Sequence, residues 1–293
     1  MNPCFFHSPD SACLSPFGEE ELLARLRKIR HVALDMDGTI YLGSSIFPFT
    51  LEFLDRLKRL GISYSFLTNN PSRSMDDYLA KLAKIGIPAT RDEMHTTAVA
   101  MVDFLTSQHP EYKRLFLMGT PSMVAQFEQA GFERTAMDTD DEPDAVVVAF
   151  DLTLTYEKLC AAAWWIAQGK PFFATNPDQT CPTDKKTILV DCGSICACLT
   201  SATGRKPDRM LGKPDPEMLY GLMEKRNLKP DEVAMVGDRL YTDVETAHNA
   251  GAFGVLVLTG ETTLETAYAA PKSPHLTVQN IEKLGELLEE SKK

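Results

Sequence analysis

The stretch HVALDMDGTIYLG, residues 31–43, decides the fold of this chain. It begins as a short apolar run, which is typical of a buried strand in a parallel sheet. The run ends in two aspartates one residue apart, Asp35 and Asp37, and Gly38 and Thr39 follow directly. Folding alone gives no reason to place two carboxylates at the tip of a buried strand, so we expect these aspartates to have a chemical role.

Strands and helices alternate along the chain around this stretch. Apolar runs predict strands over residues 31–35, 62–70, 113–119, 144–150, 171–176, 232–238 and 254–260. Helical periodicity predicts helices over residues 48–61, 74–87, 121–131, 155–169 and 241–251. This alternation favours an α/β fold with a doubly wound parallel sheet. Residues 1 to about 25 look like an appended arm, and the last ~20 look like an amphipathic terminal helix.

The composition narrows the class of protein. The chain has 293 residues, 44% of them hydrophobic, and 30 basic against 41 acidic residues give a formal charge of −11. This charge disfavours nucleic-acid binding. The first residues lack the pattern of a signal peptide, and no apolar stretch approaches the roughly 18 residues that span a bilayer. We therefore expect a cytoplasmic protein without a membrane partner.

The seven cysteines fit a reducing compartment, because an odd number in a chain of this length does not indicate a disulfide framework. Cys192, Cys196 and Cys198 cluster in the sequence, with Cys181 upstream. A metal site is conceivable there, but neither paired C-x-x-C motifs nor nearby histidines support it. Packing of small buried thiols against a helix is the favoured interpretation.

Polar residues stand at the ends of several predicted strands. In open α/β sheets, ligands bind at the carboxyl ends of the strands, where Asp35, Thr68 and Asp238 are expected. An isolated D-x-D-G could be a simple turn, but Asp238 and Asp243 add two more carboxylates after another strand. Such a cluster would repel itself unless a cation neutralised it, and oxygen ligands with open coordination positions suit Mg²⁺. A phosphate bound to this cation would need donors, and Thr68, Asn69 and Lys213 provide them.

These motifs resemble those of the haloacid dehalogenase (HAD) superfamily. Asp35 and Asp37 match its D-x-D-G-T signature, Thr68 matches the hydroxyl residue that ends the second strand, and Lys213 matches its lysine. Asp238 and Asp243 match the final acidic motif. The resemblance implies a Rossmann-like core and phosphoryl transfer through an aspartyl-phosphate.

The resemblance also implies a role for each matched residue. Asp35 would attack phosphorus, and Asp37 would act as general acid and then as general base. Asp35, the backbone carbonyl of Asp37, and Asp238 would bind Mg²⁺, with Asp243 orienting these ligands. Thr68, Asn69 and Lys213 would bind the phosphate oxygens. Dehalogenase members lack the second aspartate, so its presence favours a phosphatase.

The spacing of the motifs predicts a second, smaller α/β cap domain. The 144 residues between Thr68 and Lys213 leave room for it, as in the NagD-like and p-nitrophenyl-phosphatase branch, whose cap follows the second motif. We expect a discontinuous core over 1–90 and 188–293, and a cap over 91–187 that could also support a homo-oligomer. The residues expected to contact the substrate are Asn70, Arg73, Asn176 and Asp178, although the last two could instead cap a turn or helix.

The sequence thus predicts a Mg²⁺-dependent phosphatase that hydrolyses small phosphorylated metabolites. Two alternatives stay open. One is phosphoryl transfer to an acceptor other than water, and the other is a noncatalytic protein that binds a metabolite phosphate. The intact Asp35, Asp37 and Lys213 favour the phosphatase.

Overall fold

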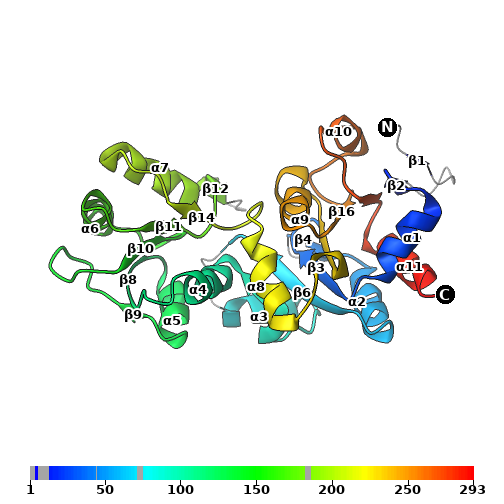
Figure 1. Cartoon of the computed structure of the whole chain (residues 1–293), viewed down its shortest axis with the longest axis horizontal. Helices are drawn as coiled ribbons and strands as arrows, with labels where there is room; N and C mark the ends of the chain where they lie inside the picture. The colour runs from blue at the N-terminus through cyan, green and yellow to red at the C-terminus, as the bar shows by residue number, and fades with distance from the viewer. Residues whose placement is uncertain (1–3, 6–12, 44, 71–74, 182–185) are drawn as a thin grey trace. The chain divides into compact units, whose positions relative to one another are not determined.

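The computed structural model describes residues 4–5, 13–43, 45–70, 75–181 and 186–293. The chain folds into two compact units, each made of separate stretches of sequence. The first unit contains Met1–Leu67, Leu79–His95 and Lys213–Lys293, and the second contains Thr68–Tyr78 and Thr96–Gly212. Figure 1 labels many of the elements of both units.

The first unit is built on an eight-stranded sheet with the order β1-β2-β17-β16-β15-β3-β6-β7. Its strands are β1 (Cys4–Phe5), β2 (Cys13–Ser15), β3 (His31–Asp35), β6 (Ser63–Thr68), β7 (Met94–Thr96), β15 (Val233–Gly237), β16 (Phe253–Val257) and β17 (Leu276–Val278), beside a separate hairpin of β4 (Tyr41–Leu42) and β5 (Ser45–Ile46). Its helices and short helical turns are α1 (Glu19–Arg27), α2 (Thr50–Arg59), α3 (Met75–Lys84, which begins in the second unit), η1 (Arg91–Glu93), α8 (Glu217–Arg226), η2 (Pro230–Glu232), η3 (Leu240–Val244), α9 (Glu245–Ala250), α10 (Leu264–Ala269) and α11 (Ile281–Ser291).

The strand that ends in Asp35, β3, lies inside this sheet. β3 pairs in parallel with β6 on one side and with β15 on the other. The first four residues of β3 are buried, as expected of a parallel strand covered on both faces. Asp35, the last residue of β3, lies opposite Leu67 in the register with β6. The predicted doubly wound α/β fold is confirmed.

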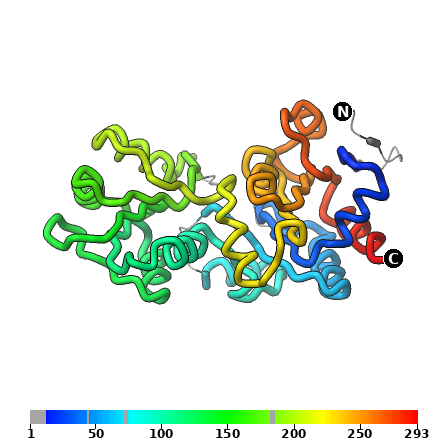
Figure 2. The backbone as a smooth tube through the Cα atoms, in the orientation of Figure 1, coloured from blue at the N-terminus to red at the C-terminus, as the bar shows by residue number. Residues whose placement is uncertain are grey.

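The N-terminal residues differ from the predicted arm. β2 extends the sheet by antiparallel pairing with β17, and α1 buries Leu22 and Leu26. α1 lies beside α11 near the C-terminus (Figures 1 and 2), where Arg27 Nε donates to the carbonyl of Ser291 at 2.6 Å. From residue 13 onward this segment is therefore an integral edge of the first unit, because its apolar side chains complete the core.

The second unit has its own, smaller sheet, with the order β14-β11-β10-β8-β9. Its strands are β8 (Arg114–Met118), β9 (Glu133–Arg134), β10 (Ala145–Val148), β11 (Phe172–Ala174) and β14 (Arg209–Met210), beside a hairpin of β12 (Thr180–Cys181) and β13 (Leu189–Val190). Its helices are α4 (Thr97–Gln108), α5 (Pro121–Gln129), α6 (Tyr156–Ala167) and α7 (Cys192–Thr203). Helices α4 and α5 pack with one face of the sheet, and α6 and α7 with the other (Figure 1).

The end of the second unit corrects one predicted boundary. The sequence placed the end of the inserted part at residue 187, but the compact unit runs to Gly212. The reason is that α7 packs into the same apolar cluster as α6 and β11, and β14 pairs with β11. Cys192 and Cys196 are buried on α7 with their sulfurs 3.9 Å apart, while Cys198 is exposed.

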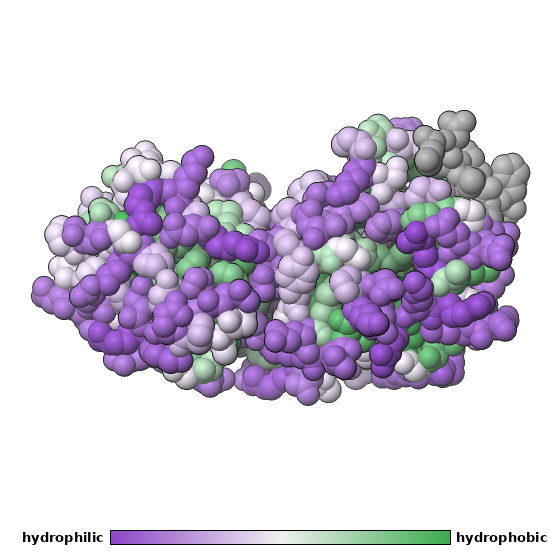
Figure 3. Space-filling view, in the orientation of Figure 1, coloured by the Kyte–Doolittle hydropathy of each residue, from purple (hydrophilic) through white to green (hydrophobic). Residues whose placement is uncertain are grey.

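Hydrophilic residues predominate on the face of each unit seen in Figure 3. Within the described part of the chain, no helix is both long enough and apolar enough to cross a membrane.

Candidate active site

Three carboxylates gather at the carboxyl ends of the strands in the first unit. Asp35 ends β3, Asp238 follows β15 directly, and Asp243 lies in the helical turn η3. One oxygen from each lies within 4.8 Å of the others, and among the described residues this carboxylate cluster is the group with the geometry to hold a metal ion. The sequence predicted one regular helix over 241–251, but η3 is a π-helical turn that precedes α9, and such turns are frequent at functional sites.

Lys213 supplies the positive charge of this site. Its buried ammonium donates to Asp35 Oδ1 and, at 2.6 Å, to Asp243 Oδ1. Burial would lower the pKa of Lys213, but the Asp243 and Asp35 carboxylates outweigh it and the pKa is raised. Lys213 therefore stays protonated, and the cluster has three carboxyl groups for this one ammonium.

Asp243 is held from two directions. Its Oδ1 accepts the bond from Lys213, and its Oδ2 accepts the backbone N–H of Arg239 at 3.1 Å. Burial raises the pKa of Asp243, while the adjacent ammonium of Lys213 opposes that shift. The ion pair favours the carboxylate, so Asp243 fixes the position of Lys213 beside Asp35.

One carboxylate oxygen of Asp238 accepts a hydrogen bond, and the other accepts none from the described residues. Oδ2 accepts the backbone N–H of Glu261 at 2.7 Å. Oδ1 is buried and accepts no hydrogen bond from the described residues. Burial raises the pKa of Asp238, and the nearby Asp35 carboxylate adds to the shift. A buried carboxylate oxygen without a donor in a cluster of net negative charge is the environment that a cation stabilises.

Two glycines leave room for Asp238. A Cβ at Gly38 would lie 2.6 Å from Asp238 Oδ2, and a Cβ at Gly260 would lie 2.0 Å from the same atom. Gly38 also has φ +85°, in the region that favours glycine. Both positions must therefore lack a side chain if Asp238 is to keep its orientation.

The loop after β16 was missed by the sequence analysis. Thr259 Oγ1 donates to the carbonyl of Gly38 at 2.5 Å, and Glu261 provides the backbone donor to Asp238. The signal was present, because the polar sequence TGET follows an apolar strand at the same edge of the sheet. This loop connects the ends of β3 and β15 through hydrogen bonds.

The structure does not place the Asp37 side chain in the carboxylate cluster. Asp37 is exposed, and its Oδ1 accepts the backbone N–H of Gly43 at 3.4 Å. Its exposure leaves it accessible to solvent and substrate. The general acid–base role of Asp37 and the metal contact through its carbonyl stay predictions.

The other predicted site residues lie in the second unit. Thr68 ends β6, and its Oγ1 accepts the backbone N–H of Asn70 at 3.2 Å. Asn69 Nδ2 donates to Asp178 Oδ2 at 3.0 Å, and Asn176 Nδ2 donates to the same oxygen at 2.9 Å. The structure thus brings Asn69, Asn176 and Asp178 together. The predicted Arg73 lies outside the described residues.

Asp191 joins this group and was also missed. It caps the N-terminus of α7, and its Oδ1 accepts from the backbone N–H of Cys192 at 2.6 Å and from Asn176 Nδ2 at 3.0 Å. Burial raises the pKa of Asp191 to about 6, although these two hydrogen bonds oppose the shift. An aspartate before a run of small residues was a readable capping signal.

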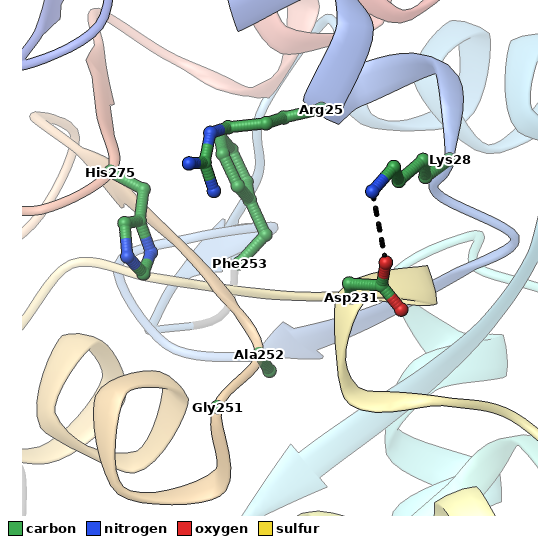
Figure 4. A pocket seen from close by; sticks show the side chains of 7 residues that line it. All are labelled: Arg25, Lys28, Asp231, Gly251, Ala252, Phe253 and His275. Carbon is green, nitrogen blue, oxygen red and sulfur yellow. Dashed lines mark hydrogen bonds and ion pairs between the residues drawn. The ribbon is translucent and has the colours of Figure 1, made fainter.

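A small cavity of about 90 Å³ lies in the first unit, away from the carboxylate cluster. It is lined by Arg25, Lys28, Asp231, Gly251, Ala252, Phe253 and His275 (Figure 4). It lies near the beginning of β16, whereas the active-site aspartates follow the ends of strands. Its two cations already form ion pairs, Arg25 with Glu21 at 2.8 Å and Lys28 with Asp231 at 3.1 Å. The charges of Arg25 and Lys28 in this cavity are therefore already balanced by neighbouring carboxylates.

The fold and site together define a class of protein. An aspartate at the end of a central parallel strand, beside a buried lysine and two further strand-end carboxylates, is suited to bind a cation and an anionic substrate. The sequence signature of the haloacid dehalogenase-like hydrolases matches residues 32–133, and that of HAD-hydrolase-like proteins matches residues 210–284.

Similar proteins agree with these matches. The acid sugar phosphatase of Staphylococcus aureus (strain USA300) is 31% identical over 240 residues, which cover 82% of this chain and 90% of that protein. Among solved structures, 4-nitrophenylphosphatase from Thermotoga maritima has a TM-score of 0.82 and 41% identity, covering 89% of this chain and 98% of that one. NagD from Escherichia coli K-12 has a TM-score of 0.79 and 29% identity, and the match covers 87% of this chain and 98% of that one.

A further solved structure is glycerol phosphate phosphatase from Mycobacterium tuberculosis in complex with magnesium. It has a TM-score of 0.81 and 30% identity, and the match covers 89% of this chain and 78% of that one. The chain belongs to the haloacid dehalogenase-like hydrolase family. The predicted similarity to its NagD-like and p-nitrophenyl-phosphatase members is confirmed, as is the predicted enzyme class, a phosphatase of this family.

Proposed function

We propose that the chain is a Mg²⁺-dependent phosphatase that hydrolyses small phosphate monoesters through an aspartyl-phosphate on Asp35. The observation that carries the proposal is the environment of Asp35, whose carboxylate accepts a hydrogen bond from the buried ammonium of Lys213 next to Asp238. A carboxylate cannot approach a phosphate dianion unless positive charge is fixed beside it. Lys213 and a bound cation would supply that charge.

The residues of the cluster fit a magnesium ion. Asp238 Oδ1 is buried without a hydrogen-bond donor among the described residues, and Gly38 and Gly260 leave room for the Asp238 carboxylate in this orientation. Asp35, the Asp37 carbonyl and Asp238 would hold the ion, with Asp243 supporting them through Lys213. When bound, the ion neutralises the excess negative charge and polarises a phosphate oxygen.

In the first step, a carboxylate oxygen of Asp35 forms a bond to phosphorus while the bond from phosphorus to the ester oxygen breaks. Lys213, Thr68 and Asn69 bind the nonbridging oxygens. Asp37 gives its proton to the departing oxygen.

In the second step, Asp37 accepts a proton from a water molecule that attacks phosphorus. The bond from phosphorus to Asp35 breaks, and inorganic phosphate is released. Asp37 is exposed, which is consistent with its access to both the leaving group and water.

We propose that the first unit is the catalytic core and that the second unit is a cap that selects the substrate, with Asn70, Arg73, Asn176 and Asp178 at the site. Proteins named acid sugar phosphatase and glycerol phosphate phosphatase among the relatives support a phosphorylated metabolite as substrate. The cytoplasmic location, the homo-oligomer and the lack of nucleic-acid or membrane partners stay predictions from composition and family.

The test is release of inorganic phosphate from p-nitrophenyl phosphate and a panel of sugar phosphates, nucleoside monophosphates and glycerol phosphate. Each assay is run with Mg²⁺, with chelator, and with the variant Asp35→Asn, which keeps the shape of the side chain. We expect Mg²⁺-dependent turnover that falls by about 10³-fold or more in the variant, because the amide is not a nucleophile. Turnover that persists in Asp35→Asn would exclude the aspartyl-phosphate.

The two alternatives give other products. Phosphoryl transfer to another acceptor would consume the ester faster than inorganic phosphate appears once that acceptor is added. A noncatalytic protein would bind inorganic phosphate and hydrolyse none of the esters.

A further inference from the structure

The segment that follows β6 is held by side chains of the second unit. Asn69 Nδ2 donates to Asp178 Oδ2 at 3.0 Å, and the Asn69 carbonyl accepts from Thr97 Oγ1 at 3.1 Å. The next carbonyl, that of Asn70, accepts from Tyr78 Oη at 2.7 Å. Of these contacts, the one with Asp178 acts on the side-chain amide of Asn69 and fixes its orientation.

Asp178 is itself held in place. Asn176, which is fully buried (0% exposed), donates to the same Oδ2 at 2.9 Å, and Thr175 Oγ1 donates to Asn176 Oδ1 at 2.9 Å, which sets the orientation of that amide. The carbonyl of Asp178 accepts the backbone N–H of Gly193 at 2.8 Å. A Cβ at Gly193 would lie 2.3 Å from the carbonyl oxygen of Pro177, so the start of α7 packs directly on this turn.

We infer that Asp178, held by Asn176, is a positioning residue that orients the side chain of Asn69 for the phosphate. The inference rests on the proposed function, in which Asn69 binds phosphate oxygens. It differs from the predicted role of Asp178 as a substrate contact, which for a residue of the cap means a contact to the leaving group of the ester. A carboxylate oxygen that already accepts two amide N–H groups is occupied with orienting its donors.

The two roles make different predictions for substrates. A residue that contacts the leaving group affects esters unequally and leaves the binding of inorganic phosphate unchanged, since inorganic phosphate has no leaving group. Loss of a residue that orients Asn69 lowers kcat/KM for every ester by the same factor and weakens the binding of inorganic phosphate as well. Inorganic phosphate is therefore the decisive probe.

The experiment compares Asp178→Ala, Asp178→Asn and the control Asp140→Ala in the full chain. Asp140 is an exposed aspartate of the same unit, and its backbone N–H donates to Asp138 Oδ1 while its carboxylate accepts no hydrogen bond from the described residues. We expect Asp178→Ala to lower kcat/KM about 10- to 100-fold, the scale of a small misplacement, by one common factor on p-nitrophenyl phosphate and glycerol phosphate. The dissociation constant of inorganic phosphate, measured by calorimetry with Mg²⁺, should rise as well. Asp178→Asn should retain most activity, because its amide oxygen can accept both hydrogen bonds.

A double-mutant cycle separates a direct effect from one through Asn69. If Asp178 acts through Asn69, then Asn69→Ala and the double variant should bind inorganic phosphate equally weakly, because the second change has nothing further to disorient. Additive losses, substrate-dependent losses, or unchanged phosphate binding in Asp178→Ala would each overturn the inference. Asp178→Ser replaces Asp178→Ala if the latter does not fold. Wild-type protein without turnover would instead refute the proposed function, and the calorimetric cycle would still decide the role of Asp178.

Discussion

Each unit of this protein has a cluster of acids at the ends of its strands, and the two clusters are stabilised differently. In the first unit, Asp35, Asp238 and Asp243 share one ammonium, and one buried oxygen of Asp238 lacks a hydrogen bond. In the second unit, Asp178 and Asp191, here called the amide-held pair, both accept hydrogen bonds from the same side-chain amide, that of Asn176.

The comparison shows that a cluster of acids does not by itself define a metal site. Burial raises the pKa of Asp238 and of Asp191 alike, so the direction of the pKa shift does not distinguish the two clusters. Their hydrogen-bond donors distinguish them. In the amide-held pair, Asp178 Oδ2 and Asp191 Oδ1 each accept two N–H groups without a cation, whereas the carboxylate cluster keeps a buried oxygen, Asp238 Oδ1, without a donor among the described residues. Changes to the donors should therefore have different consequences in the two units.

The largest effect is expected from Lys213→Met, which keeps the length of the side chain and removes its charge. The buried Asp243 and the partly buried Asp35 would then lack their ammonium partner. We expect the free energy of unfolding to fall by about 3–5 kcal/mol and kcat/KM to fall by about 10²- to 10³-fold. Urea unfolding and steady-state kinetics on p-nitrophenyl phosphate measure the two losses.

The matched control is Lys58→Met, because Lys58 is half-exposed and its nearest acidic partner, Asp55, is 3.9 Å away. We expect the free energy of unfolding to fall by less than about 1 kcal/mol in this control, as for other surface ion pairs. If Lys213→Met were no more harmful than Lys58→Met, the lysine could not be the charge that holds the carboxylate cluster together.

A smaller and more selective effect is expected from Gly260→Ala. The added Cβ would lie 2.0 Å from Asp238 Oδ2 and must displace that carboxylate. We expect the Mg²⁺ concentration for half-maximal activity to rise about 10- to 100-fold, as when the support of a metal ligand is lost. A Mg²⁺ titration of phosphatase activity measures the shift.

Gly193→Ala is the corresponding change beside the amide-held pair, with its Cβ 2.3 Å from the Pro177 carbonyl oxygen. It should cost about 1–3 kcal/mol of stability through overpacking and leave the Mg²⁺ titration midpoint unchanged. Gly18→Ala, where the added Cβ meets no atom within 4 Å beyond its chain neighbours, should leave the Mg²⁺ titration midpoint unchanged and cost less than about 1 kcal/mol, because Gly18 is the N-cap of α1. Equal Mg²⁺ shifts in Gly193→Ala and Gly260→Ala would contradict the assignment of the metal to the first unit.

The sequence predicted the first cluster better than the second, for a physical reason. The proximity of Asp35 and Asp238 could be anticipated because parallel strands bring their carboxyl ends to one edge of a sheet, whatever the loops do. The motif match added Lys213 and Asp243 to the same group. The fold followed from the alternation of strands and helices, and the family from the resemblance of the motifs.

The second cluster depends on side-chain amides that sequence patterns do not orient. Asn69, Asn176 and Asp178 were all named, but their mutual hydrogen bonds were not foreseen, because each residue could equally cap a turn. The boundary at residue 187 was misplaced for a related reason. The apolar face of α7 could pack on either sheet, and only the tertiary contacts with α6 assign it to the second unit.

An effect of opposite sign, a gain in stability, is expected from Asp191→Asn. The pKa of Asp191 is raised to about 6 from its ordinary 3.8, so between these pH values the folded chain binds more protons than the unfolded chain. Stability therefore falls as pH rises from about 4 to about 6 and is constant above. An asparagine can accept the same bonds from Cys192 and Asn176 through Oδ1 without a buried charge. We expect the variant to be more stable at pH 7 by up to about 3 kcal/mol, the equivalent of the pKa shift, and to lose this advantage near pH 4.

Urea unfolding at both pH values, with Asp140→Asn as the exposed control, measures the difference in stability. A variant less stable than wild type at pH 7 would mean that the Asp191 carboxylate is needed in its charged form, and the amide-held pair would then resemble the carboxylate cluster more closely than its donors suggest.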